Sequence, residues 1–150
     1  MIRPARQIKT YLKQGITPDN LALSIVFGAS FGTIPIIGVS ALICFWLALV
    51  FRLNLAVIQF FNFLFYPVQL LTIYPMIWLG CAVFKPSARP DSSERFRQTL
   101  NEAWWKPLVL FAEAHVYGLL TWFLIILPIA VVSYFILRRR LSGLMLSMQD

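Results

Sequence analysis

Amide and hydroxyl side chains recur inside the second of three long apolar stretches of this chain. Gln59, Asn62, Tyr66 and Gln69 follow one another at intervals of three or four residues, which places them on one face of a continuous helix. A polar face inside a membrane has to meet protein, water or a ligand rather than lipid. Two interpretations stay open for it: hydrogen bonds between helices, or the lining of a substrate path.

A basic turn lies between the first and second apolar stretches and contains Arg52 and Asn54. Arginine holds phosphate through two parallel hydrogen bonds, so this turn is a candidate site for a phosphate-bearing head group. The alternative is a turn that only anchors the chain at the level of the lipid head groups.

The chain shows no arrangement typical of an enzyme. Glu113 and His115 are the one acid and the one histidine within an apolar stretch, but residues two apart do not share a helix face. Cys44 and Cys81 lie in separate apolar stretches, where two buried thiols are more common than a disulfide. The sequence contains no nucleophile with a recognisable base, no carboxylate pair and no phosphate-binding loop. We therefore expect a protein that is not an enzyme and that carries no metal and no cofactor.

The composition predicts an integral membrane protein. Of the 150 residues, 59% are hydrophobic and 13% are charged, which is about half the charged fraction of a soluble domain. The mean hydropathy is +0.75. Three stretches (21–51, 55–84 and 108–137) contain Glu113 as their one formal charge. Each has about 30 residues, more than the roughly 20 that cross a bilayer.

Membrane topology explains the net charge of +7 better than nucleic acid does. All 13 Lys and Arg residues lie outside the three apolar stretches. Basic loops are retained on the cytoplasmic side and are attracted to its anionic lipids. We expect the lipid bilayer as a partner, no nucleic acid, and a cytoplasmic N-terminus that is not a cleaved signal.

One membrane domain accounts for the whole chain. Thr17 suits a helix N-cap and Pro18 suits the first helical position, so a helix begins near residue 18. Asp91 and Glu94 resemble a capping box at the start of an amphipathic helix. The segments are a basic interfacial segment (1–16), a broken-helix membrane region (17–84), an interfacial amphipathic helix (85–107), a C-terminal membrane segment (108–137) and a basic tail (138–150).

Proline and glycine interrupt the first apolar stretch. Thirty residues of straight helix span about 45 Å, whereas the hydrocarbon core of a bilayer is about 30 Å thick. Pro35 removes a backbone donor and Gly38 adds a second breaker, so we predict half-helices over 18–33 and 39–51. Backbone groups freed at such a break must be bonded within the protein or line a cavity.

Two interpretations of this break stay open. In transporters, the half-helix ends at such a break bind substrates and ions. Alternatively, Gly28 and Gly32 form a G-x-x-x-G pair that lets another helix approach closely, and Pro35 only turns a hairpin.

Basic segments flank all three apolar stretches, so the rule that basic loops stay cytoplasmic favours stretches that turn back. By this argument 21–51 is a hairpin, and 55–84 is a second one that breaks at Pro67, with Pro75 as the alternative position of its break. The third stretch is either a hairpin or a 22-residue span over 116–137 with Pro128 as a kink.

Several of these residues together carry a family resemblance. They are Pro18, Leu21, Ala22, Gly28, Gly32, Pro35, Gly38, Ala48, Arg52 and Asn54. Through them, residues 17–80 resemble the bacterial membrane family called domain of unknown function 2062 (DUF2062), whereas 85–150 shows no such similarity. The family usually has Asn-Pro where this chain has Tyr66-Pro67, and usually a glutamine in place of Ser40. The resemblance implies a bacterial cytoplasmic (inner) membrane protein, related to proteins that stand alone or are attached to glycosyltransferases.

These observations predict an all-α integral membrane protein with Pro/Gly-broken, re-entrant transmembrane helices and short interfacial amphipathic helices. We expect a transporter or flippase for a lipid-linked or small anionic substrate, and a homo-oligomer because so few spans cannot enclose a path alone. The alternative is a non-catalytic anchor or scaffold that organises a partner such as an envelope glycosyltransferase. The candidate substrate-binding residues are Pro35, Gly38, Arg52, Asn54, Gln59, Asn62 and Tyr66, with Gly28 and Gly32 as helix-packing residues.

Overall fold

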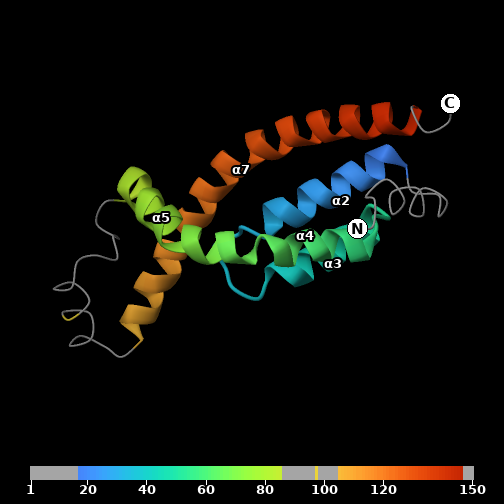
Figure 1. Ribbon diagram of the computed structural model, residues 1–150. Helices are drawn as coiled ribbons and strands as arrows, with labels where there is room; N and C mark the ends of the chain where they lie inside the picture. Colours follow the sequence, from blue (N-terminus) through green and yellow to red (C-terminus); the bar gives the residue numbers. More distant parts are fainter. Residues whose placement is uncertain (1–16, 86–96, 98–104, 147–150) are drawn as a thin grey trace.

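In the computed structural model, residues 17–85, Arg97 and residues 105–146 are described. These residues form helices joined by short turns and contain no strand, so the predicted all-α class is confirmed for them. The helices are α2 (Pro18–Phe31), α3 (Ser40–Val50), α4 (Leu55–Leu64), α5 (Tyr66–Phe84) and α7 (Lys106–Leu146) (Figure 1). The interfacial segment predicted over 1–16, and most of the one over 85–107, lie outside the described residues.

Helices α2 and α3 form the predicted hairpin. The Thr17 side chain accepts a hydrogen bond from the Asn20 backbone N–H at 3.2 Å, and Pro18 occupies the first turn, so α2 begins as expected. The chain breaks between Phe31 and Ser40. The Asn54 backbone N–H then meets the Ser24 hydroxyl at 3.3 Å, which returns the end of α3 to the first half of α2.

The second apolar stretch does not turn back. Phe65 interrupts it, but its backbone stays helical (φ −88°, ψ −1°) and serves as both the C-cap of α4 and the N-cap of α5. Its N–H bonds to the Phe61 carbonyl, and its own carbonyl accepts from the Gln69 N–H. The hairpin predicted at Pro67 is therefore wrong. Proline is tolerated in the first turn of a helix, where its missing N–H needs no partner, so Pro67 starts α5 instead of reversing the chain.

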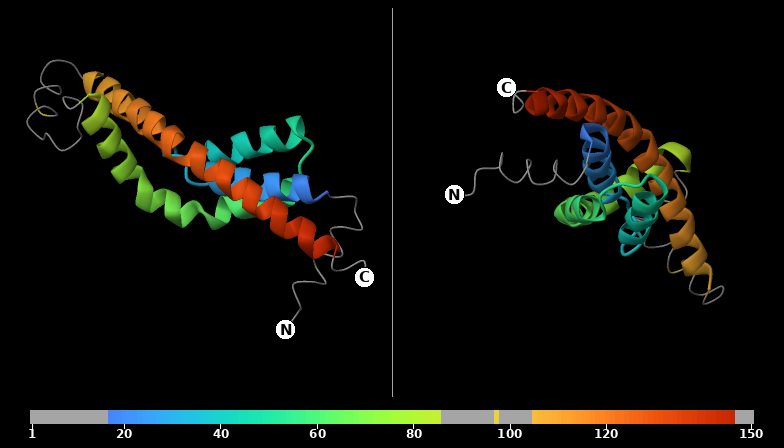
Figure 2. Two further views of the ribbon diagram at one scale, coloured as in Figure 1. Left: turned by 90° about the horizontal axis from the view of Figure 1, so that it is seen from above. Right: turned by 90° about the vertical axis from the view of Figure 1, so that its right-hand side faces the viewer.

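Helix α7 forms the spine of the molecule (Figure 2). Its 41 residues span about 60 Å, and Pro128 lies inside the helix without ending it. The helix extends beyond the predicted segment 108–137 at both ends, so 138–146 of the expected basic tail is helical. Arginine is a good helix former, which is why three arginines in a row do not terminate it.

Contacts with α7 show where the other helices lie along its axis. Three of these contacts follow one another from the C-terminal end of α7 toward its start: Asp19 with Arg138, Thr33 with Trp122, and Lys85 with Glu113. The start of α2, the α3–α4 turn and the end of α7 therefore share one end of the molecule, visible on the right of Figure 1. We call it the basic end, after Arg52 and the three arginines at 138–140.

The α2–α3 break lies far from the basic end. Trp122, which contacts the break, is 16 residues from Arg138, or about 24 Å along the helix. Lys85, which follows α5, lies farther still along α7, because it pairs with Glu113. The chain on either side of residues 86–104 thus stands at the opposite end from the basic end, in line with α7 as a long span.

The buried interior is small and most large apolar side chains are exposed. Buried residues gather in three clusters: Cys44 with Ala48, Leu53 and Ile58; Ile77 with Cys81 and Ala114; and Leu21 with Ala22 and Leu141. The two cysteines are free and buried in different clusters. Large apolar side chains are exposed along α3, α4, α5 and α7. Within the described residues, Tyr66–Phe84 and Lys106–Leu144 are long and apolar enough to span a membrane.

Candidate functional site

The turn between α2 and α3 has a buried start and an exposed tip. Pro35 is less than 2% exposed, and the Ile36 N–H donates to the Ile34 carbonyl at 2.7 Å. Ile37 is 59% exposed, and Gly38 has φ +85°, a conformation that favours glycine. The breakers thus fold the chain tightly and leave three residues at the tip, 37–39, open to the surroundings.

Gln69 of α5 satisfies the backbone of this turn. Its amide Nε2 donates to the Ile34 carbonyl at 2.6 Å and to the Ile36 carbonyl at 3.1 Å, and the side chain is fully buried. These carbonyls flank Pro35, so a side chain 34 residues farther along the chain bonds the groups that the break leaves without helical partners. At Gln69 the polar face of the second stretch therefore serves packing between elements.

Gln59 and Asn62 of α4 are also turned inward. Gln59 Nε2 donates to the Ala41 carbonyl at the start of α3, at 2.9 Å. Asn62 is 1% exposed, yet neither its amide nitrogen nor its amide oxygen finds a hydrogen-bond partner among the described residues. A buried polar group without a partner costs about 1–3 kcal/mol. Asn62 is thus the candidate residue best suited to bind water or a polar group of a ligand.

The interruption at Phe65 changes the polar face that the spacing predicts. Asn62 precedes the interruption, Tyr66 begins α5 and is half-buried, and Gln69 follows one turn later. Asn62 and Gln69 both remain buried, but they belong to two helices rather than to one continuous face.

Arg52 and Asn54 occupy the α3–α4 turn at the basic end. Asn54 Oδ1 accepts from the Val57 N–H at 3.0 Å, so it caps α4. Arg52 is exposed and has φ +53°, a left-handed conformation that costs a residue other than glycine about 1–2 kcal/mol. Helix α3, about 15 Å long, separates Arg52 from the break. The structure therefore does not bring Arg52 together with Pro35 and Gly38.

Gly28 and Gly32 pack α2 against α4, as the G-x-x-x-G pattern predicts. A Cβ on Gly28 would overlap the Ile58 carbonyl and lie 2.8 Å from the Phe61 Cβ. A Cβ on Gly32 would lie 2.7 Å from the Asn62 carbonyl. The partner helix belongs to the same chain, and this close approach brings Asn62 against α2.

Sequence reasoning missed the contact that ties α7 to the break. The Trp122 indole Nε1 donates to the Thr33 hydroxyl at 3.1 Å in a buried position, and that hydroxyl donates to the Ser30 carbonyl at 2.7 Å. Trp122 and Thr33 are 89 residues apart, and a tryptophan in an apolar stretch carries no signal of its partner.

The acid and the histidine of the third stretch lie away from the break. Glu113 pairs with Lys85, and His115 Nδ1 lies 2.8 Å from the Phe111 carbonyl on its own helix. The described residues bring together no group of three His, Cys, Asp or Glu side chains that could hold a metal ion.

Comparison with known families decides where the chain belongs. The family described as "Uncharacterized protein conserved in bacteria (DUF2062)" matches residues 4–144. The chain belongs to the DUF2062 family. The match extends well beyond the resemblance over 17–80 and includes almost all of α7, so the expectation that 85–150 has no family similarity is wrong. No curated protein and no solved structure matches this DUF2062 chain. A bacterial family and two helices of membrane-spanning length together fit a membrane protein.

Proposed function

We propose that this DUF2062 protein is a transporter or flippase of the bacterial cytoplasmic membrane, with a lipid-linked or small anionic substrate. The observation that carries this proposal is the α2–α3 hairpin. It ends in a tight break with exposed residues 37–39 at its tip and buried polar side chains of α4 and α5 behind it. Broken helices of this kind form substrate sites in membrane transporters.

Helix lengths support a re-entrant hairpin. Helices α2, α3 and α4 have 14, 11 and 10 residues, and each is therefore about 15–21 Å long. None of the three crosses a hydrocarbon core of about 30 Å by itself. With the basic end at the lipid head groups, the break about 24 Å away lies in the far half of a hydrocarbon core about 30 Å thick. Exposed apolar side chains such as Leu42 and Trp46 on α3 then face lipid.

Charge supports the orientation. The sequence before Thr17, the α3–α4 turn and residues 138–140 contain four, one and three Lys and Arg residues, against five over 85–106, which joins the helices at the opposite end. The rule that basic loops stay inside puts the basic end, and with it the N-terminus, on the cytoplasmic side.

The separated candidate residues suggest successive stations for one substrate. Arg52 at the cytoplasmic surface attracts a phosphate or other anionic group. Asn62, buried beside Gly32 where α2 ends at the break, offers an unpaired amide to a polar group. The exposed tip at 37–39 receives the group at the far side of the hairpin. One chain has too few helices to enclose a path of this kind, so we expect a homo-oligomer.

Accessibility of the tip tests the membrane placement of the break. We expect Ile37→Cys, in a chain with Cys44 and Cys81 replaced by Ala, to react with a water-soluble maleimide applied from one side of the membrane. Arg139→Cys, exposed at the basic end, is the control for the cytoplasmic side. No reaction at Ile37→Cys from either side, with normal reaction at Arg139→Cys, would mean a dry break and remove the observation on which the proposal depends.

Measured movement of a substrate across the membrane decides between transport and a scaffold role. The packing roles of Gln59 and Gln69 favour the scaffold role. The assay follows movement of a fluorescent phosphatidylglycerol between leaflets of vesicles, read as the fraction bleached by external dithionite. Transport predicts complete bleaching with the native protein and slower bleaching with Asn62→Leu or Arg52→Ala at equal protein levels. Bleaching equal to that of protein-free vesicles would refute lipid transport, and the same vesicles loaded with radiolabelled phosphate test a small anion.

A further inference from the structure

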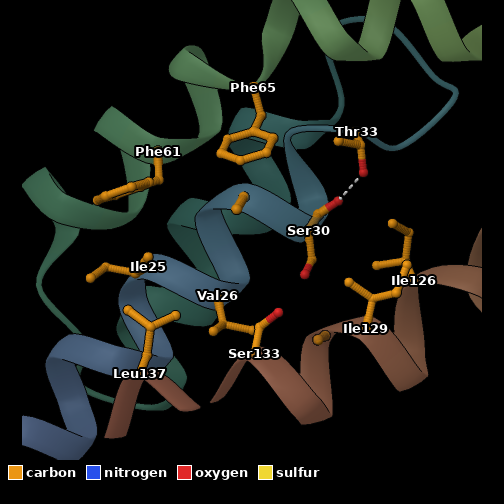
Figure 3. A pocket seen from close by; sticks show the side chains of 12 residues that line it. Ile25, Val26, Ser30, Thr33, Phe61, Phe65, Ile126, Ile129, Ser133 and Leu137 are labelled. Atoms are coloured by element: carbon orange, nitrogen blue, oxygen red, sulfur yellow. Dashed lines mark hydrogen bonds between the residues drawn. The ribbon is translucent and has the colours of Figure 1, made fainter. Parts of the chain in front are cut away.

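A crevice lies beside the break, between α2, α4 and α7 (Figure 3). Phe61 of α4 and Phe65 at its C-cap form one side, and Ile129 and Ser133 of α7 form the other, with α2 between them. Its volume is about 250 Å³. Pockets that enclose a whole small molecule usually have about 300–1,000 Å³. This crevice therefore has room for one part of a larger molecule that extends outside it.

The lining suits hydrocarbon. Its side chains are aliphatic or aromatic apart from three hydroxyls, those of Ser30, Thr33 and Ser133, and none is charged. The Thr33 hydroxyl is already engaged, because it accepts from Trp122 and donates to the Ser30 carbonyl. An anion or a hydrated polar group would lose its water here without gaining partners, whereas a hydrocarbon chain loses nothing.

The crevice points toward a particular arginine. Ile126, Ile129, Ser133 and Leu137 line it from α7 at intervals of three or four residues, so they share one helix face over about 17 Å. The next position on that face is Arg140, three residues after Leu137, and it is exposed.

The two neighbouring arginines face elsewhere. Arg139 lines a separate hollow with Phe135 and Ser142, on the opposite side of α7. The Nε of Arg138 lies 2.7 Å from the Asp19 carboxylate. Arg140 is therefore the arginine placed at the end of the crevice, where the basic end meets the head groups.

We propose that this crevice holds one acyl chain of an anionic phospholipid and that Arg140 binds the phosphate of its head group. The second acyl chain stays in the bilayer, since the crevice is open on one side and too small for both. This inference rests on the proposed function and narrows its substrate class from anions in general to phospholipids. The crevice is apolar and uncharged, and a cationic side chain lies at its cytoplasmic end. A site of this kind fits an amphiphile better than a water-soluble anion.

Lipid binding by the full-length protein tests the inference. Native mass spectrometry of the detergent-solubilised protein would be titrated with phosphatidylglycerol, and with phosphatidylcholine for comparison. We expect Arg140→Ala to weaken phosphatidylglycerol binding about tenfold, as loss of one charge-assisted hydrogen bond would do. Arg139→Ala removes the same charge from the opposite face of α7 and should bind like the native chain.

Two further variants probe the crevice itself. Ala130→Leu should fill it and lower binding of both lipids. Ser133→Val replaces a hydroxyl with a methyl group and should leave binding unchanged or stronger, and it keeps the test decisive if Ala130→Leu fails to fold. A loss of binding in Ser133→Val would mean that the site recognises a polar group, which overturns the proposal.

Other results would also overturn it. These are equal weakening by the two arginine variants, tighter binding of the single-chain dodecyl phosphate than of phosphatidylglycerol, and a lipid-free dimer that Ala130→Leu dissociates. The last result would identify a second copy of the chain as the occupant. Binding as expected without leaflet-to-leaflet movement would instead refute the proposed transport and leave this site standing.

Discussion

Gly28, where α2 and α4 come closest, offers the sharpest test of the fold that positions Asn62. In an ordinary helix, Gly→Ala raises stability by about 0.5–1 kcal/mol, because alanine has less backbone freedom to lose. At Gly28 the new methyl group would overlap the Ile58 carbonyl, which is backbone and cannot rotate away. Helix α4 would have to move outward, and overpacking of this kind costs about 1–3 kcal/mol.

Gly143 provides the matched control. It also lies inside a helix, α7, but a Cβ there would meet nothing within 4 Å. Gly143→Ala should therefore show the helix gain alone. Because that gain is common to both variants, the difference between Gly28→Ala and Gly143→Ala isolates the clash, which we expect to be about 1–3 kcal/mol.

Thermal unfolding of the detergent-solubilised protein measures this difference. For a chain of this size 1 kcal/mol shifts the midpoint by about 2–4 °C, so Gly28→Ala should unfold about 2–12 °C below Gly143→Ala. Equal midpoints would show that α2 and α4 do not approach as closely as the structure has them. The placement of Asn62 against α2 would then fail with it.

Two further predictions concern the candidate site. Gln69→Leu removes both hydrogen bonds to the turn around Pro35, and although the Ile34 carbonyl keeps the Ile36 N–H, the Ile36 carbonyl loses its donor. We therefore expect a lower unfolding midpoint and a faster maleimide reaction at Ile37→Cys. An unchanged labelling rate would show that Gln69 does not hold the tip. Arg52→Gly relieves the strain of the left-handed backbone at φ +53°, so it should raise the free energy of unfolding by about 1 kcal/mol. It should also slow the movement of lipid between leaflets. Faster or unchanged movement would show that Arg52 is not part of the path.

Several features of the chain could be predicted from interactions between residues that are close in sequence. The Thr17 and Pro18 start and the break around Pro35 follow from backbone donors, caps and fixed torsions within a few residues, and the structure has them where the sequence predicts. The close approach at Gly28 and Gly32 also follows from residue type, although the sequence does not say which helix approaches. Composition alone indicated an all-helical protein with helices of membrane-spanning length.

The sequence argument failed where two local outcomes had nearly the same cost. A proline near the middle of 55–84 can end one hairpin arm or begin a second helix, since in either case its missing N–H needs no partner. Packing of α5 against α7 decides for the second helix, through the close crossing of Gly80 on Tyr117. The basic segments on either side of 55–84 favoured a hairpin, but the preference of basic loops for the cytoplasmic side is weaker than the packing of α5 against α7.

What the sequence by itself determined is therefore the start of α2 and the break between α2 and α3, because those depend on interactions between near neighbours in the chain. Only the tertiary structure decided which of the polar residues meet. Gln69 reaches the turn around Pro35 across more than thirty residues, and Trp122 reaches Thr33 across 89. Arg52, close to these in sequence, lies a helix length away. Such contacts depend on how helices cross, and helix crossing is set by packing over the whole chain rather than by any local pattern.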